Sequence, residues 1–132
     1  MNEYFLGVDP GRSKTGLAIT DRSGRIHYLK VAQTADLKQE LAECIQRFLP
    51  TAAIIGNGTN SSKVADVVQQ VGPELPLSMI EEAHSTEEAR KLYWEENPPR
   101  GWRRLVPLGL LVPDEPLDAY AAAVLLRRFL CR

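Results

Sequence analysis

The first third of the chain consists of short apolar runs separated by turn residues. The three runs are Tyr4–Val8, Leu17–Thr20 and Arg25–Ala32. The sequence "DPG" follows the first run, and "DRSG" follows the second. Short apolar runs bounded by such residues are typical of strands. Because tight turns join antiparallel neighbours, the pattern predicts a three-stranded antiparallel meander.

Helical spacing dominates the chain after residue 33. Apolar residues recur every three or four positions in 37–48, 64–71 and 89–93, and the apolar runs 52–55 and 77–80 separate these segments. Strand–helix–strand order favours parallel strands. We therefore predict an α/β fold: a mixed five-stranded sheet, three antiparallel strands and then two parallel ones, with helices on both faces.

Polar residues stand where these helices are expected to begin. Thr34 precedes the first helix, Asn60 or Ser61 the second, and Ser85 with Glu88 three residues later has the pattern of a capping box. We predict side-chain caps at these positions.

A long loop over 96–113, containing "NPPRGWRR", precedes the expected final helix. Pro116 suits the first position of that helix, which would place Glu115 at its N-cap and Asp118 at its third position. Arg127 and Arg128 lie near its C-terminal end, where cations are favoured in any helix, so we assign them no role.

Composition narrows the class of protein. The 132 residues are 44% hydrophobic and 25% charged, which is typical of one globular domain. No apolar stretch approaches the roughly 20 residues that span a bilayer, and "MNEYF" lacks the features of a signal peptide, so we expect a cytoplasmic protein without membrane contact. Cys44 and Cys131 have no metal-ligand spacing, and we expect two free thiols.

Charge is unevenly distributed although the net charge is only −1. Residues 1–30 hold five Lys/Arg and three acids, residues 31–89 hold three and nine, and residues 90–132 hold eight and five. If the two ends of the chain meet in the fold, they bring positive charge to one region.

Acids follow the first and fifth strands and accompany the start of the last helix. They are Asp9; Glu81 and Glu82; and Asp114, Glu115 and Asp118. The carboxyl ends of parallel strands share one edge of a sheet, so these acids can converge. Clustered carboxylates repel unless a divalent cation joins them, and Mg²⁺ or Mn²⁺ prefers such ligands. Two ions about 4 Å apart can hydrolyse a phosphodiester.

Each acid also has a structural interpretation. Asp9 before Pro-Gly is a common turn residue, and Glu115 and Asp118 stabilise a helix start without any function. Glu81 and Glu82 face opposite sides because they are adjacent, so only one can point at Asp9. His84 could carry a proton, although a loop histidine before a helix is more often structural.

Basic and aromatic residues suggest contacts with nucleic acid. Gly11 and Gly16 would let the first turn approach a phosphate, and "RGWRR" offers guanidinium groups around an indole that can stack on a base. The alternative is a solvated loop whose tryptophan packs on the core. The candidate nucleic-acid-binding residues are Arg12, Lys14, Arg100, Trp102, Arg103 and Arg104.

Several segments resemble one known superfamily. "LGVDPGRSKTGLAI" closely resembles the first-strand motif of RuvC-type Holliday-junction resolvases, Asp-Pro-Gly-x-x-x-Thr-Gly. "IEEAHSTEEARKL" resembles the Asp-Glu-Arg-(Leu)-(Ser/Thr)-Thr-x-Glu-Ala signature of the YqgF branch. "PLDAYAAAVLLRRFL" is similar to the last helix of both, and "AAIIGNGTNSSKVADVV" to the fourth strand and following helix of YqgF proteins. Together the segments cover nearly the whole chain in the right order.

The resemblance implies a single ribonuclease-H-like domain over residues 1–132 and a Mg²⁺- or Mn²⁺-dependent nuclease. Its implied substrate is structured nucleic acid, either branched DNA or a precursor of 16S ribosomal RNA. Asp9, Glu82 and Asp118 match the catalytic, metal-binding acids, and Glu115 matches a further acid of RuvC enzymes. Junction resolution needs two active sites, which would favour a homodimer.

The chain departs from these motifs at three points. RuvC enzymes carry a glutamate at the end of the fourth strand, where this chain has Asn57 and no acid. Ala83 replaces the arginine of the YqgF signature, and "NGTNSS" lacks that branch's proline. These departures favour, as the alternative, a catalytically weak or inactive nucleic-acid- or ribosome-associated binding module. Asp-x-Gly-x-x-x-x-Gly also describes the phosphate loop of actin- and sugar-kinase-type ATPases, which need two domains.

Overall fold

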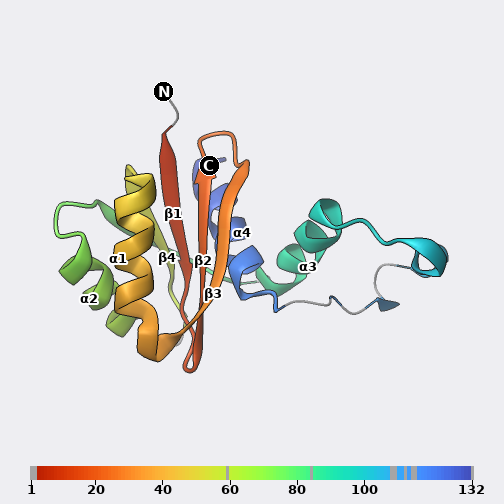
Figure 1. Ribbon diagram of the computed structural model, residues 1–132, viewed down its shortest axis with the longest axis horizontal. Helices are drawn as coiled ribbons and strands as arrows, with labels where there is room; N and C mark the ends of the chain where they lie inside the picture. Colours follow the sequence, from red (N-terminus) through yellow and green to blue (C-terminus); the bar gives the residue numbers. More distant parts are fainter. Residues whose placement is uncertain are drawn as a thin grey trace.

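The computed structural model describes residues 3–58, 60–83, 85–107, 110–111, 113 and 116–131. Its centre is a five-stranded sheet of order β3-β2-β1-β4-β5 (Figure 1). The strands are β1 (Tyr4–Asp9), β2 (Lys14–Asp21), β3 (Ile26–Gln33), β4 (Ala52–Gly56) and β5 (Leu77–Ile80). β1 pairs antiparallel with β2 and parallel with β4, which confirms the predicted mixed sheet. β2 and β3 are antiparallel, and β4 and β5 are parallel.

Helices cover both faces of the sheet. They are α1 (Leu37–Phe48), α2 (Ser61–Val71), α3 (Ser85–Glu96) and α4 (Asp118–Leu130), with 3-10 helices η1 (Thr34–Asp36) and η2 (Gly101–Leu105). α1 and α2 lie on one face and α4 on the other, while α3 packs against α4 and leads away from the sheet (Figure 1). None of the described helices is both long and apolar enough to cross a bilayer.

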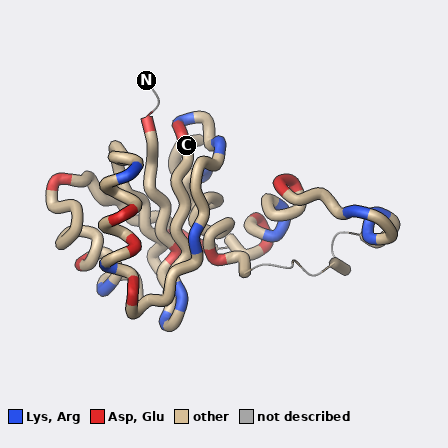
Figure 2. The backbone as a smooth tube through the Cα atoms, viewed as in Figure 1, with Lys and Arg blue, Asp and Glu red and all other residues tan. Residues whose placement is uncertain are grey.

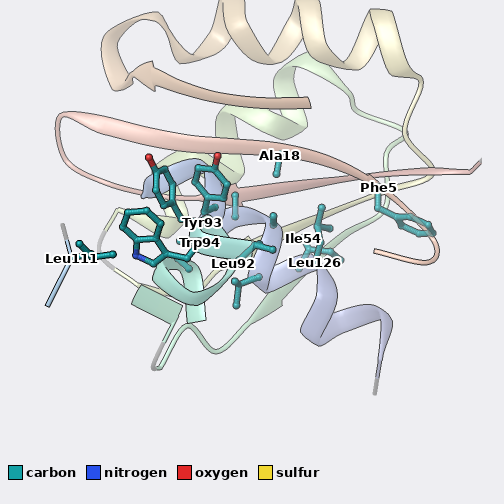
Figure 3. Close-up of a cluster of buried hydrophobic side chains, with 14 residues drawn as sticks. Phe5, Ala18, Ile54, Leu92, Tyr93, Trp94, Leu111 and Leu126 are labelled. Atoms are coloured by element: carbon teal, nitrogen blue, oxygen red, sulfur yellow. The ribbon is translucent and has the colours of Figure 1, made fainter. Parts of the chain in front are cut away.

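Alternation along the strands divides the apolar residues between two cores. Leu6 and Val8 of β1 pack with residues of α1 and α2, whereas Phe5 packs with residues of α3 and α4. Figure 3 shows the second core, in which Trp94 lies edge-on to Tyr93, with ring centroids 4.9 Å apart. Cores on both faces explain why the central strands are apolar at nearly every position.

Small residues bring α4 close to the sheet. A Cβ atom at Gly7 would lie 2.5 Å from the carbonyl oxygen of Ala122, and one at Gly16 would overlap the carbonyl oxygen of Asp118. The helix contributes the buried run Ala121, Ala122 and Ala123 to this contact. The backbone of α4 therefore rests almost directly on β1 and β2.

The predicted cap at Thr34 is wrong, and the one at Asn60 is confirmed in position but makes no side-chain cap hydrogen bond. Thr34 lies in η1 rather than before α1, and its hydroxyl donates to the carbonyl of Gly11 at 3.2 Å. Asn60 precedes α2 in a left-handed conformation with φ 71°, but its side-chain amide donates to the same carbonyl at 3.2 Å. Both side chains serve the β1–β2 turn, because tertiary contacts with it replace the local cap.

The last two helices also differ from prediction. The Glu88 carboxylate accepts a hydrogen bond from Arg128 at 3.0 Å instead of completing a capping box. The residue before α3, His84, lies outside the described residues. α4 begins at Asp118, so this acid occupies the first helical position and not the third.

The two cysteines are free, as predicted. Cys44 lies on the buried face of α1, and burial raises the pKa of its thiol to about 12, which leaves it unreactive at neutral pH.

Candidate active site

Asp9 and Glu82 meet beyond the carboxyl ends of the parallel strands. Asp9 ends β1, and alternation places it on the same face as Phe5 and Gly7, toward α4. Glu82 follows β5 by two residues. The two carboxyl groups are hydrogen-bonded to each other.

Asp118 approaches the same point from α4. Gly16 is the register partner of Asp9 in β2, and its backbone lies against the Asp118 backbone. Burial raises the pKa of Asp9 to about 8, with further increases from its hydrogen bond to Glu82 and from the negative charges of Glu82 and Asp118. Acids from the beginning, middle and end of the chain thus form one group, which we call the acidic cluster (Asp9, Glu82 and Asp118).

The structure separates the two adjacent glutamates that the sequence left open. Glu82 is partly buried and touches Asp9, whereas Glu81 is exposed. Asp114, Glu115 and His84, the other candidates of the sequence analysis, lie outside the described residues.

The acidic cluster is a pair of touching carboxyl groups with a third nearby. In the part of the chain that the structure describes, no group of three or more His, Cys, Asp or Glu side chains is arranged as a ready metal site. Because the pKa of Asp9 lies near 8, its carboxyl group keeps its proton at neutral pH. The acidic cluster presents only carboxyl oxygens, the donors that hard cations prefer.

Glu82 also supplies an acid beside the end of β4, where the strand itself has none. A Cβ atom at Gly56 would lie 2.6 Å from Glu82 Oε2, and one at Gly58 would overlap Oε1. Asn57, between them, is exposed, and its backbone amide donates to Ile80 at 3.0 Å. In the sequence, the two glycines that flank Asn57 were the signal that a side chain from another segment could fit here.

Arg12, on the β1–β2 turn, and Lys14, the first residue of β2, are exposed shortly after Asp9. The turn is held from two sides: the carbonyl of Gly11 accepts hydrogen bonds from Thr34 and Asn60. The two cations therefore stand on and beside a fixed turn that follows Asp9.

The remaining basic candidates lie on a projection that we call the arm (residues 97–107). Figure 1 shows η2 at the far end of the molecule from α2, and Figure 2 shows basic residues gathered there. Trp102 is 72% exposed and Leu105 is 88% exposed, so the alternative in which the tryptophan packs on the core is wrong. At the base of the arm the Asn97 side chain donates to the Tyr120 hydroxyl at 3.0 Å, which fixes the arm to α4.

One residue near the acidic cluster was missed. Arg128, to which the sequence assigned no role, donates to backbone carbonyls on both sides of Glu82. No sequence pattern could reveal this contact, because its acceptors belong to the backbone.

Comparison with known proteins identifies the fold. RuvC from Thermus thermophilus, solved in complex with a Holliday-junction substrate, is 16% identical, with a TM-score of 0.61 over 97% of this chain and 93% of RuvC. A second structure of RuvC from Thermus thermophilus is 16% identical, with a TM-score of 0.60 over 96% and 93%. No protein-family model matches the chain, and no curated protein matches it significantly. The chain therefore has the ribonuclease-H-like fold of RuvC-type resolvases.

Proposed function

We propose that this protein is a divalent-metal-dependent nuclease that hydrolyses phosphodiester bonds in structured nucleic acid, either branched DNA or a ribosomal RNA precursor. The observation that carries the proposal is the convergence of Asp9, Glu82 and Asp118 at the carboxyl edge of the sheet. Buried acids in contact destabilise a fold, so their presence together favours a site that binds a cation.

The residues fit a hard divalent cation. Asp9, Glu82 and Asp118 offer only carboxylate oxygens, the donors that Mg²⁺ and Mn²⁺ prefer, and they would hold the metal. Glu115 would be a fourth ligand. When bound, such an ion acts as a Lewis acid toward a phosphodiester and activates a water molecule.

The chain's own residues would supply charge balance and substrate binding. Asp9 must release its proton to become a ligand, and because its pKa is raised to about 8, an incoming cation displaces that proton at neutral pH. Arg12 and Lys14 would neutralise backbone phosphates beside the cluster, and because the Gly11 carbonyl is held twice, little ordering of the turn is required.

A catalytically weak binding module remains the second candidate, favoured by Asn57 at the end of β4. The position of the Glu82 carboxylate over Gly56 and Gly58 supports the active enzyme instead, because an acid from the segment after β5 occupies the neighbourhood of Asn57.

The test is cleavage of a four-way DNA junction and of a structured precursor-type RNA with Mn²⁺. Asp9→Asn is expected to lower the rate at least about 1,000-fold, since it removes a ligand at the reacting centre. Asp66→Asn, an exposed acid on α2, is the matched control and should cleave like wild type. Equal rates for wild type and Asp9→Asn would reject the nuclease, and salt-dependent binding without cleavage would select the binding module.

The substrate comparison also separates the two nucleic acids. Preference for the junction, together with a dimer in sedimentation, favours resolution by two sites. Preference for the RNA favours precursor processing. ATP binding would instead support the phosphate-loop alternative.

The arm supports a contact with unpaired nucleotides. It carries Arg100, Arg103 and Arg104 and no acid, and the exposed Trp102 provides a flat surface on which a base can stack. A paired base is already stacked within its helix, so the indole favours single-stranded or unpaired segments of a structured substrate.

We expect Trp102→Ala to weaken binding of a single-stranded oligonucleotide about tenfold, the effect of losing one stacked base. Leu49→Ala is the control, because Leu49 is 77% exposed and lies outside the arm. In the Trp94→Phe variant Trp102 is the remaining tryptophan, so intrinsic fluorescence reports on it directly. A single-stranded oligonucleotide should quench this fluorescence more than a duplex of equal charge does. Unchanged binding by Trp102→Ala, or self-association through the arm, would contradict the contact.

A further inference from the structure

A single guanidinium group holds the segment that carries Glu82. Arg128, in the last turn of α4, donates from Nη1 to the carbonyl oxygen of Glu81 at 3.0 Å and from Nη2 to that of Ala83 at 2.6 Å. Its Nε donates to Glu88 Oε2 on α3 at 3.0 Å. The Arg128 side chain is only 23% exposed, so one arginine joins α4, α3 and both neighbours of Glu82.

The segment depends on these contacts because it has left the sheet. β5 ends at Ile80, whose carbonyl accepts the amide of Asn57 at 3.0 Å. The carbonyl of Glu82 accepts the amide of Ser85 at 3.1 Å. Of the three consecutive carbonyls in 81–83, Arg128 satisfies the outer two and the start of α3 satisfies the middle one.

We propose that Arg128 is a positioning residue that fixes the backbone on both sides of Glu82 and so holds its carboxylate against Asp9. The planar guanidinium suits this task, because two of its nitrogens can reach two carbonyls at once in a fixed geometry. α4 also carries Asp118, so the same rigid helix would set the positions of two members of the acidic cluster. The positioning of Glu82 by Arg128 stands apart from the proposed nuclease; only its effect on metal binding and catalysis rests on that proposed function.

The test compares Arg128→Gln with Arg127→Gln. Arg127 is a matched control: it precedes Arg128 on the same helix and donates to the carbonyl of Gly24, in the β2–β3 turn, at 3.1 Å. Arg128→Gln should lower Mn²⁺ affinity and kcat by about 10- to 100-fold, the usual effect of losing a group that orients a ligand, with KM unchanged. Arg127→Gln should change neither.

Two further variants separate charge from geometry. Arg128→Lys keeps the charge but lacks the planar fork, so its losses should fall between wild type and Arg128→Gln. Glu88→Gln keeps both carbonyl contacts and should bind Mn²⁺ like wild type. A loss of Mn²⁺ affinity in Glu88→Gln as large as in Arg128→Gln would assign the effect to the ion pair and overturn the proposal.

A readout without metal or substrate keeps the two proposals distinct. The Glu82 carboxylate lies against Gly56 and Gly58, so their amide chemical shifts report its position. These shifts should change in Arg128→Gln and stay constant in Arg127→Gln. If wild type neither binds Mn²⁺ nor cleaves, the nuclease is rejected and the glycine shifts alone decide the role of Arg128. Glycine shifts that are the same in both variants would overturn the positioning role.

Discussion

Replacing Asp9 by asparagine should stabilise the metal-free protein, and the gain should grow with pH. The carboxyl group ionises near pH 3.8 in the unfolded chain, whereas the folded environment raises its pKa to about 8. Its contribution to folding is therefore fully present below pH 3.8 and is lost as the pH rises through about 8. Asparagine suffers no such loss. We expect Asp9→Asn to be more stable by about 5 kcal/mol at pH 8 and by less than about 1 kcal/mol near pH 4.

Urea unfolding in EDTA at a series of pH values measures this difference. A gap in unfolding free energy that does not change between pH 4 and pH 8 would contradict the raised pKa of Asp9.

Adding Mn²⁺ at pH 8 should narrow this gap. The ion replaces the proton of Asp9 in wild type, so it should raise the unfolding midpoint of wild type by several degrees and leave Asp9→Asn nearly unchanged. Asp66→Asn is the control for nonspecific binding of Mn²⁺ and should respond like wild type. An equal response in all three proteins would show that the ion does not bind at Asp9.

Gly16→Ala should be the most damaging single-methyl change near the site. The added Cβ would overlap the backbone carbonyl of Asp118 and lie 2.8 Å from the amide nitrogen of Ala119. Neither a central strand nor the first turn of a buried helix can move away cheaply. We expect a loss of about 3 kcal/mol, or roughly 10 °C in the unfolding midpoint, because overpacking against backbone is costly.

Gly72→Ala provides the comparison for Gly16→Ala. At Gly72 the nearest atoms, on Ile45 and Leu75, would lie 3.4 Å from the new Cβ, which is ordinary contact. We expect a change within about 1 kcal/mol. Similar losses for the two variants in urea unfolding would argue against the close approach of α4 to β2.

The mixed sheet was predictable because each strand has its own local signal. β5 was located at 77–80 from its apolar run alone, and the structure agrees. β2 begins earlier than predicted, at Lys14. Lys14 and Gly16 have little preference for strands, so the sequence pattern did not include them, but pairing with β3 holds them in the strand. The caps failed for a related reason: Thr34 and Asn60 bind Gly11, 23 and 49 residues away, and no local pattern records such a partner.

The meeting of acids was predictable in outline from the shared edge of parallel strands. Asp9 was placed by its position at the end of a buried strand, and Asp118 by the start of the last helix. Alternation alone left the choice between Glu81 and Glu82 open, because both follow β5. The family resemblance matched Glu82, and the structure places that residue against Asp9. Arg128 was beyond sequence reasoning, since two of its three acceptors are carbonyls that every residue possesses.

The dispersal of the acidic cluster along the chain has a consequence for biosynthesis. A polypeptide leaves the ribosome N-terminus first, so Asp9 and Glu82 emerge well before Asp118. Nascent chains that lack α4 hold neither the third acid nor Arg128. The cluster therefore comes into being only once that helix has been translated and has docked on the sheet.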